Sequence, residues 1–294
     1  MNPLVISGAY GTLDRHQEVD PLNIGDERVR SVHDASYRAY AQQAGIVVTN
    51  TFRTRNVLRR QETDRFQNII AEHVRLLREI LRPDQKLAVS FGPWGDCYKP
   101  EEAASFAEAA DFWETAFSIL LSIRDRVDIA LTETINTSTE AAAIAEAWGR
   151  VQKDNRAGTQ LITSIIPKSG GKLYSGEDLS QLPLAIRSRA GRVPLLGLNC
   201  FPINDLAPAL EALSGKARVG LVYPNAADGD PKYHEGSKSI ASRSGHEAAR
   251  LLSSVIRQFR ETHPNIITGE CCGTDFKRIE DISKSRLEET TPVA

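Results

Sequence analysis

The feature that most constrains the fold of this chain is a regular alternation of short apolar runs with longer amphipathic stretches. The apolar runs are rich in β-branched residues, which predicts strands, and the stretches between them show helical spacing of apolar side chains. Eight predicted strands occupy residues 4–8, 45–52, 86–92, 128–134, 160–166, 194–200, 218–225 and 265–272. The clearest helical patterns occupy residues 66–81, 106–123, 139–154 and 245–261. Ser138 or Thr139 is expected to cap the third of these helices.

This alternation predicts an α/β protein with the fold of a (β/α)8 TIM barrel. Eight strands alternating with helices in about 250–300 residues are typical of that barrel, and the chain has 294 residues. The alternative is a doubly wound open sheet, but GAYGTL at residues 8–13 is not the GxGxxG turn expected after its first strand. No linker divides the chain, so residues 1–294 are predicted to form a single domain with a disordered tail near residues 285–294.

Composition argues against two classes of partner. The formal net charge is −2, so the chain offers no basic field for nucleic acid, and RTRNVLRR at residues 53–60 fits the solvated start of a helix. No apolar run approaches the ~20 residues of a membrane span, and the first residues lack the pattern of a secretory signal. The sequence therefore predicts a cytoplasmic protein that binds neither nucleic acid nor membrane. It makes no prediction about the oligomeric state.

Three of the four cysteines fall at the ends of predicted strands. Cys200 ends the sixth strand, and Cys271 and Cys272 end the eighth, where Gly273 permits the turn that lets both thiols approach one point. Inward side chains from alternate strands of a barrel meet in one layer, so a single ion could bridge the three sulfurs. Three thiolates favour zinc. Three buried cysteines without a metal are the alternative.

A zinc ion with three protein ligands keeps one coordination position open, which is typical of catalytic rather than structural sites. Cys97 follows the third strand, across the barrel, and is interpreted as a small buried side chain. Three anionic sulfurs make the metal a poor activator of water, whereas a substrate thiol suits such a soft site. A thiol bound there loses its proton at neutral pH, so the predicted chemistry is alkyl transfer to sulfur.

Several segments resemble the homocysteine S-methyltransferase family. They are GAYGT (8–12), TNTF (49–52), GPWGD (92–96), ET (133–134), GLNC (197–200), YPNA (223–226) and ECCGT (270–274). The resemblance implies a zinc (β/α)8 barrel in which Cys200, Cys271 and Cys272 hold one metal ion per chain. It also implies that homocysteine supplies the attacking thiolate and becomes methionine. By position, Glu133 would hold the substrate amino group, and Asn225 would orient substrate or a ligand.

The chain departs from the family pattern near both ends. Ser7 stands where the family has an aspartate that helps to bind the amino acid end of homocysteine. Glu270 replaces the glycine before the cysteine pair and is expected to add negative charge near the metal. Phe276 and Arg278 replace a proline and a histidine further on. Homocysteine is therefore the leading acceptor, and the sequence does not decide whether it is the true one.

The methyl donor must carry a good leaving group, such as a sulfonium, a quaternary ammonium or a corrinoid. The short members of the family use S-methylmethionine or S-adenosylmethionine, and the chain length favours such a sulfonium donor over betaine or a corrinoid partner protein. A barrel that senses zinc or redox state without catalysis is the remaining alternative. In each enzymatic case the predicted partners are small thiol and methyl-onium molecules.

Aromatic faces can bind onium groups. The aromatic residues near the predicted mouth of the barrel are Tyr10, Phe52, Trp94, Tyr98 and Tyr223. Trp94, in the glycine-flanked GPWGD turn, is the first candidate for this role. Ser7 and Thr51, at the ends of the first two strands, complete the predicted substrate-binding residues.

Overall fold

The computed structural model describes residues 5–7, 20–123, 125–155, 158–226, 244–274 and 276–290. Seven parallel strands form one sheet in the order β1-β2-β3-β4-β7-β8-β9. Their bounds are β1 Ile46–Val48, β2 Lys86–Phe91, β3 Ile129–Ile135, β4 Gln160–Ile165, β7 Leu195–Asn199, β8 Val219–Tyr223 and β9 Ile267–Thr268. A short antiparallel pair, β5 (Pro167–Lys168) and β6 (Lys172–Leu173), follows β4. The GAYGTL segment with Tyr10 lies outside the described residues.

The structure describes residues 5–7 of the first predicted strand, and two of these residues join the edges of the sheet. Val5 bridges Thr268 of β9, and Ile6 bridges Ile46 of β1, both in the parallel sense. The Ile6 N–H donates to the Thr268 carbonyl at 2.9 Å, and the Ser7 N–H donates to the Ile46 carbonyl at 3.0 Å. The sheet therefore curls into a barrel, as predicted, and is not a doubly wound open sheet.

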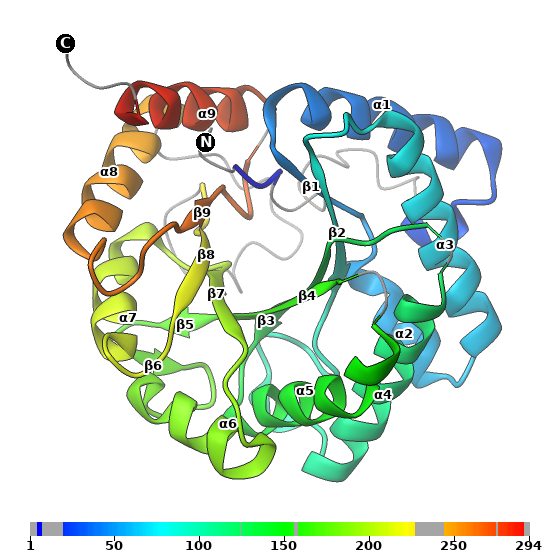
Figure 1. Cartoon of the computed structure of the whole chain (residues 1–294), viewed down its shortest axis with the longest axis horizontal. Coiled ribbons are helices and arrows are strands. Elements are labelled where there is room, and N and C mark those ends of the chain that lie inside the picture. The colour runs from blue at the N-terminus through cyan, green and yellow to red at the C-terminus, as the bar shows by residue number, and fades with distance from the viewer. Residues whose placement is uncertain are drawn as a thin grey trace.

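Helices form an outer ring around the strands (Figure 1). Their bounds are α1 Glu27–Gln43, α2 Arg55–Arg59, α3 Thr63–Ile80, α4 Phe106–Ser122, α5 Ser138–Val151, α6 Leu182–Ala190, α7 Leu206–Leu213, α8 Gly245–Gln258 and α9 Phe276–Thr290. Capping boxes begin α4, at Ser105 and Glu108, and α8, at Ser244 and Glu247. None of the described helices combines the length and apolar character that a membrane crossing requires.

The predicted cap of α5 is wrong. Thr137, rather than Ser138 or Thr139, caps the helix, and its hydroxyl accepts the Glu140 N–H at 3.1 Å. Thr137 has the extended backbone of a cap residue, whereas Ser138 is already the first helical residue. The Ser138 hydroxyl instead donates to the Glu177 carboxylate.

The last helix extends further than predicted. Helix α9 continues to Thr290, so the tail expected to be disordered from about residue 285 is helical over its first six residues. The Ser283 hydroxyl donates to the Gln43 carbonyl of α1 at 2.6 Å, and Lys284 pairs with Glu280 one turn earlier. The Ser283–Gln43 bond ties the helix to α1, which the polar composition of this segment does not reveal. Residues 291–294 lie outside the described residues.

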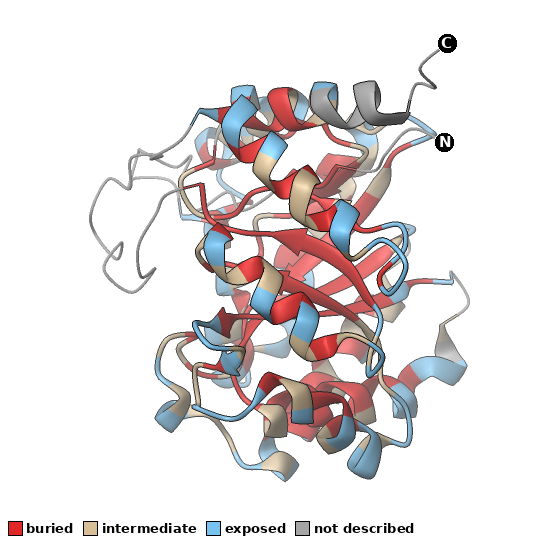
Figure 2. Cartoon of the chain, turned by 90° about the vertical axis from the view of Figure 1, so that its left-hand side faces the viewer, coloured by how far each residue is buried: buried red, intermediate tan, exposed pale blue. Residues whose placement is uncertain are grey.

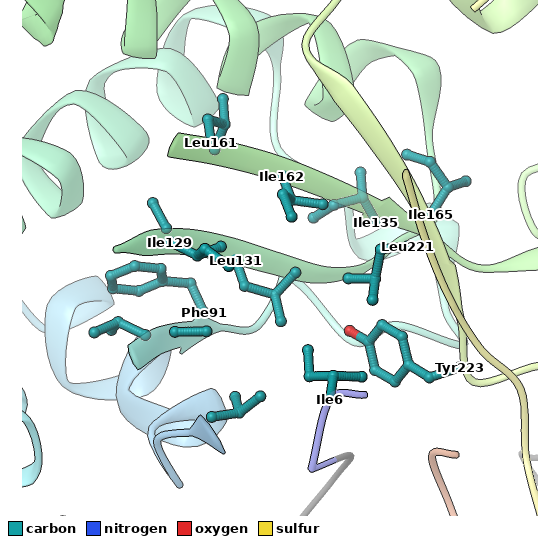
Figure 3. Close-up of a cluster of buried hydrophobic side chains, with 14 of the residues drawn as sticks. Ile6, Phe91, Ile129, Leu131, Ile135, Leu161, Ile162, Ile165, Leu221 and Tyr223 are labelled. Atoms are coloured by element: carbon teal, nitrogen blue, oxygen red, sulfur yellow. The ribbon is translucent and has the colours of Figure 1, made fainter. Parts of the chain in front are cut away.

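Side-chain alternation along the strands separates two buried layers. Figure 2 shows that the strands are buried and that exposed residues lie on outer helix surfaces and loops. Figure 3 shows Ile6, Leu221 and Tyr223 grouped between the strands, inside the barrel. Phe91 of β2 instead packs outward against Trp113 and Phe117 of α4, with ring centroids 6.3 Å apart in each pair. The neighbours of Phe91 on β2 therefore face the barrel interior.

Two histidines are buried beside the first strands. The rings of His33 and His73 lie 5.1 Å apart, and both side chains are almost fully buried. The Tyr37 hydroxyl accepts the Asn50 N–H at 2.8 Å and lies 2.7 Å from His73 Nδ1, so it donates to that nitrogen. Burial lowers the pKa of His73 to about 3 and that of His33 to about 4. Both rings are therefore neutral in the folded protein at pH 7.

We expect the free energy of unfolding to fall as the pH decreases below about 6.5, the ordinary pKa of histidine. Between this pH and the lowered pKa values, His33 and His73 are protonated in the unfolded chain but stay neutral in the folded protein. Each of these histidines then lowers the free energy of unfolding by about 1.4 kcal/mol per pH unit. Urea unfolding at pH 6.5 and pH 5 measures the loss. The variant His33→Asn should show a shallower pH dependence than the wild type. Equal slopes in the variant and the wild type would contradict the assignment.

Candidate metal and substrate site

Three thiols meet at the carboxyl-terminal ends of β7 and β9. Cys200 directly follows β7, and Cys271 and Cys272 follow β9. Their sulfur atoms all lie within 4.8 Å of one another. The Cys200 sulfur is 2.6 Å from that of Cys271 and 3.5 Å from that of Cys272. The structure thus brings together the three cysteines that the sequence singles out, although 71 residues separate the first from the second.

The end of β8 holds the two cysteine loops together, because this strand lies between β7 and β9. The carbonyl of its last residue accepts the Cys200 N–H at 3.3 Å, and the Pro224 carbonyl accepts the Cys271 N–H at 2.7 Å. The Asn225 side-chain oxygen accepts the Cys272 N–H at 3.2 Å. Asn225 therefore contacts the backbone of a predicted metal ligand.

The backbone is left-handed at three places around this cluster. Gly273 has φ +84°, which provides the turn predicted after the cysteine pair, but Cys200 and Thr134 also have positive φ, at +60° and +55°. Side chains seldom tolerate this region, and such strain concentrates at functional sites. The Asn199 side-chain oxygen accepts the Thr134 N–H at 3.0 Å and the Ser164 hydroxyl at 2.7 Å. These bonds hold the strained end of β3 against β4 and β7.

The donor set fits a thiophilic cation. Contact with the other two thiols raises the pKa of Cys200 well above its ordinary value, and burial does the same for Cys271. The thiols therefore need a cation to ionise together. Zinc–sulfur bonds of ~2.3 Å place two sulfurs about 3.8 Å apart, close to the separation of Cys200 and Cys272, whereas the Cys200–Cys271 pair would have to open. No fourth His, Cys, Asp or Glu joins the group among the described residues.

The loop after β2 approaches these thiols. Burial raises the pKa of Cys97 to about 12, and the Cys272 thiol makes a small further contribution. Burial, followed by the Cys200 thiol, raises the pKa of Tyr98. The Asn136 amide donates to the Cys97 carbonyl at 3.0 Å and holds the loop in place. Cys97 is nevertheless not a member of the three-sulfur group.

Glu133 is a buried carboxylate whose described partners are hydroxyl groups. The Ser90 hydroxyl donates to Oε2, and the Tyr223 hydroxyl donates to Oε1 at 2.6 Å. Burial raises the pKa of Glu133, the Cys272 thiol adds to this rise, and no cation among the described residues opposes it. A carboxylate in this setting is suited to pair with an ammonium group brought by a substrate.

Two other predicted substrate residues hold strands together. The buried Ser7 hydroxyl oxygen accepts the Val48 N–H of β1 at 3.0 Å. The buried Thr51 hydroxyl lies 2.7 Å from the Ser90 carbonyl, to which it donates. These two hydrogen bonds join neighbouring strands, and a role of Ser7 and Thr51 in substrate binding stays a prediction.

Trp94 lies at the rim of the barrel. The Arg59 guanidinium lies over its ring, 5.1 Å from the centroid, and the Phe112 ring meets it nearly at a right angle at 5.2 Å. One ring face thus already has a cation beside it, which weakens Trp94 as a site for a methyl-onium donor. Its predicted role is otherwise untested.

Sequence reasoning missed the polar residues inside the strands. Ser90 and Ser164 interrupt otherwise apolar runs, and both face polar side chains in the barrel interior. An isolated serine within a predicted buried strand is a usable sequence signal, because a buried hydroxyl group needs a hydrogen-bond partner. This signal would have identified both residues. Tyr223 was considered as an aromatic wall, whereas its hydroxyl binds Glu133.

The two departures from the family pattern around the cysteine pair form one buried ion pair. Arg278 donates from Nε to Glu270 Oε2 at 2.6 Å and from Nη2 to Oε1 at 2.7 Å. The two side chains are only 8% and 2% exposed. Arg278 therefore balances the negative charge that Glu270 was expected to add next to the cysteines.

We expect each single variant, Glu270→Gln and Arg278→Met, to lower the free energy of unfolding by about 3–5 kcal/mol, because each leaves an unpaired charge or an unmatched polar group in the interior. The double variant should lose clearly less than the sum, since neither charge then remains. Denaturant unfolding of all four proteins measures the coupling. If the losses of the two single variants sum to the loss of the double variant within about 0.5 kcal/mol, Glu270 and Arg278 do not stabilise each other.

The comparisons with known proteins agree with this geometry. The family model for homocysteine S-methyltransferase matches residues 4–286. The metallated and apo forms of the homocysteine methyltransferase MmuM from Escherichia coli match with TM-scores of 0.73 and 0.69, both at 18% identity over 97% of this chain and 96% of that chain. A GH10 endoxylanase from a sugarcane soil metagenome matches with a TM-score of 0.55, at 9% identity over 92% of this chain and 86% of its own. These structural similarities show the fold alone. A search of curated protein sequences gives no match.

Proposed function

The chain belongs to the homocysteine S-methyltransferase family, whose model matches residues 4–286, and from this premise we propose that it transfers a methyl group from a sulfonium donor to the thiol of homocysteine with the help of zinc. The observation that carries the proposal is the convergence of three sulfur atoms within 4.8 Å, with no fourth ligand among the described residues. Such an incomplete thiolate set suits a substrate thiol as the remaining ligand.

Cys200, Cys271 and Cys272 would hold one zinc ion per chain, and the ion would lower the pKa of the acceptor thiol so that it ionises at neutral pH. The protein supplies the positioning. Glu133 binds the acceptor ammonium group, and the hydroxyls of Ser90 and Tyr223 keep that carboxylate in place. Fixing the acceptor in a buried site lets the sulfur meet the methyl carbon in line and without competing water.

In the proposed step, the acceptor sulfur forms a bond to the methyl carbon while the bond from that carbon to the sulfonium sulfur breaks. The electron pair of the broken bond stays on the donor sulfur, which leaves as a neutral thioether. The proton of the acceptor thiol passes to solvent. S-methylmethionine and S-adenosylmethionine both satisfy this balance, and homocysteine becomes methionine in either case.

Product analysis tests the reaction and the donor together. The zinc-loaded protein is incubated with homocysteine deuterated in its carbon chain and, separately, with S-methylmethionine, S-adenosylmethionine or betaine, and methionine that carries the chain label is measured by mass spectrometry. We expect labelled methionine from a sulfonium donor and none from betaine. Product from betaine alone, or only with a methylated corrinoid protein, would overturn the donor assignment. No product with any donor would overturn the reaction.

X-ray absorption distinguishes the enzyme from a zinc sensor. Zinc in the enzyme should gain one sulfur neighbour when homocysteine is added, because the thiol occupies the remaining position. A sensor would show the same four protein ligands with and without the thiol. That second outcome would favour the non-catalytic alternative.

A further inference from the structure

Arg55, the first residue of α2, carries a guanidinium group that the proposed reaction does not use. Its Nε and Nη1 atoms are buried and have no hydrogen-bond partner among the described residues. The group lies over the Phe52 ring, 5.2 Å from the centroid, and burial lowers the pKa of Arg55. Buried charged donors are normally paired, because leaving them unpaired destabilises the fold. An unpaired guanidinium therefore indicates a place for an anionic ligand.

The guanidinium lies at the mouth of the barrel, against the end of β2. Ser90 faces the interior, where its hydroxyl binds Glu133, and Phe91 faces the helices. If this alternation continues past the end of β2, Gly92 turns to the interior again. A Cβ atom on Gly92 would lie 2.6 Å from the Phe52 carbonyl oxygen and 2.9 Å from Arg55 Nη1. The glycine thus lets the Phe52 backbone and the guanidinium approach the end of β2.

The spacing of the two charges suits an α-amino acid. Successive inward positions on a strand are about 7 Å apart, so Gly92, beside Arg55 Nη1, would lie roughly that far from Ser90, whose hydroxyl binds Glu133. The ammonium and carboxylate groups of an amino acid, with one hydrogen bond at each end, span about 8 Å. One zwitterion could therefore bind both side chains.

We propose that Arg55 binds the carboxylate of the acceptor thiol, while Glu133 binds its ammonium group. The inference rests on the proposed function and narrows it to acceptors that are α-amino acids. A guanidinium suits this role because it binds carboxylates through two parallel hydrogen bonds. The Ser7 hydroxyl, in contrast, is already used by the Val48 N–H.

A competing role for Arg55 is that of a structural counter-ion. Asp96 and Glu140 both favour its charged form. Glu140 already accepts the Trp94 N–H at 2.7 Å and the Trp113 ring N–H at 3.2 Å, and burial raises its pKa to about 7. A counter-ion role predicts that loss of Arg55 weakens all acceptors equally, whereas carboxylate binding predicts a selective loss.

Kinetics with two acceptors separate these roles. Homocysteine carries the carboxylate, and 3-aminopropanethiol lacks it. We expect Arg55→Met to lower kcat/KM for homocysteine at least about tenfold and to leave kcat/KM for 3-aminopropanethiol unchanged. Arg60→Met, which removes the same charge from an exposed position on the same segment, should match the wild type with both acceptors. Equal losses with both acceptors in Arg55→Met would overturn the proposal.

A binding measurement keeps this test independent of the reaction. Calorimetry measures the affinity of the protein for methionine and for 3-(methylthio)propylamine, which lacks the carboxylate. This measurement needs neither zinc nor a methyl donor. The wild type should prefer methionine, and Arg55→Met should lose that preference. If the wild type transfers no methyl group yet prefers methionine, the proposed function fails and the role of Arg55 stands. If Arg55→Met does not fold, Arg55→Lys, which keeps the charge but not the paired donors, should show a reduced preference, and an unchanged preference would overturn the proposal.

Discussion

Replacement of Cys272 by alanine is expected to remove zinc from the protein and to lower methyl transfer to homocysteine by about 10³-fold, the scale of several kcal/mol that a metal ion contributes. Two remaining thiols hold zinc poorly at neutral pH, because each must ionise and the set is incomplete. The acceptor thiol then keeps its ordinary pKa of ~8.5 and is mostly protonated at pH 7. Cys272 is the best of the three to change, since it is only partly buried, whereas Cys200 and Cys271 are buried.

Elemental analysis after dialysis measures the zinc content, and the product assay measures the activity. Cys97→Ala is the matched control, because Cys97 is a buried cysteine outside the three-sulfur group. It should keep zinc and activity. Full zinc content and full activity in Cys272→Ala would refute the assignment of the site, whereas lost activity with full zinc would restrict Cys272 to another role.

Replacement of Glu133 by glutamine is expected to lower kcat/KM for homocysteine by about 10²-fold while leaving the zinc content unchanged. Removing one member of a buried, hydrogen-bonded charge pair typically costs 2–5 kcal/mol of binding. Glutamine has one acceptor oxygen where the carboxylate has two, and its NH2 group would meet either the Ser90 or the Tyr223 hydroxyl, both of which donate to Glu133. The loss should therefore fall on acceptors that carry an ammonium group.

The acceptor 4-mercaptobutanoate, which lacks the ammonium group, provides the control. Its kcat/KM should not fall in Glu133→Gln. Burial raises the pKa of Glu133, so kcat/KM of the wild type for homocysteine should decrease as the pH falls through that raised value, and this decrease should be absent in the variant. An equal loss with both acceptors would show that Glu133 supports the structure of the site rather than the ammonium group.

Much of the fold follows from the sequence because its signals are local. The alternation of apolar and amphipathic segments predicts the strands and helices, and the barrel then places every strand end at one mouth. For that reason Cys200 and the Cys271–Cys272 pair could be placed together without coordinates. The first strand was predicted at residues 4–8, and in the described part of the chain Val5 and Ile6 join β9 to β1. The pattern within this segment predicts a strand, but its pairing with both edges of the sheet is a long-range contact.

The contacts that individual side chains make could not be predicted from local sequence patterns. Trp94 was expected to offer a free ring face, but Arg59, from another element, lies over the ring. Glu270 was expected to leave a charge beside the cysteines, but Arg278 reaches back from the last helix to balance it. Each contact depends on side-chain rotamers and on how a loop or helix packs, which local patterns do not encode.

The sequence by itself determined the barrel, the meeting of three thiols and the acidic strand end at Glu133, because strand order and strand ends follow from patterns within short segments. Only the tertiary structure decided that Glu133 is bound by Ser90 and Tyr223 and that two guanidinium nitrogens of Arg55 are buried with no partner in the described part of the chain. Those facts depend on burial and on long-range register. The affinity of a charged group for a ligand is set by what already surrounds it, and the surroundings form only when the chain is folded.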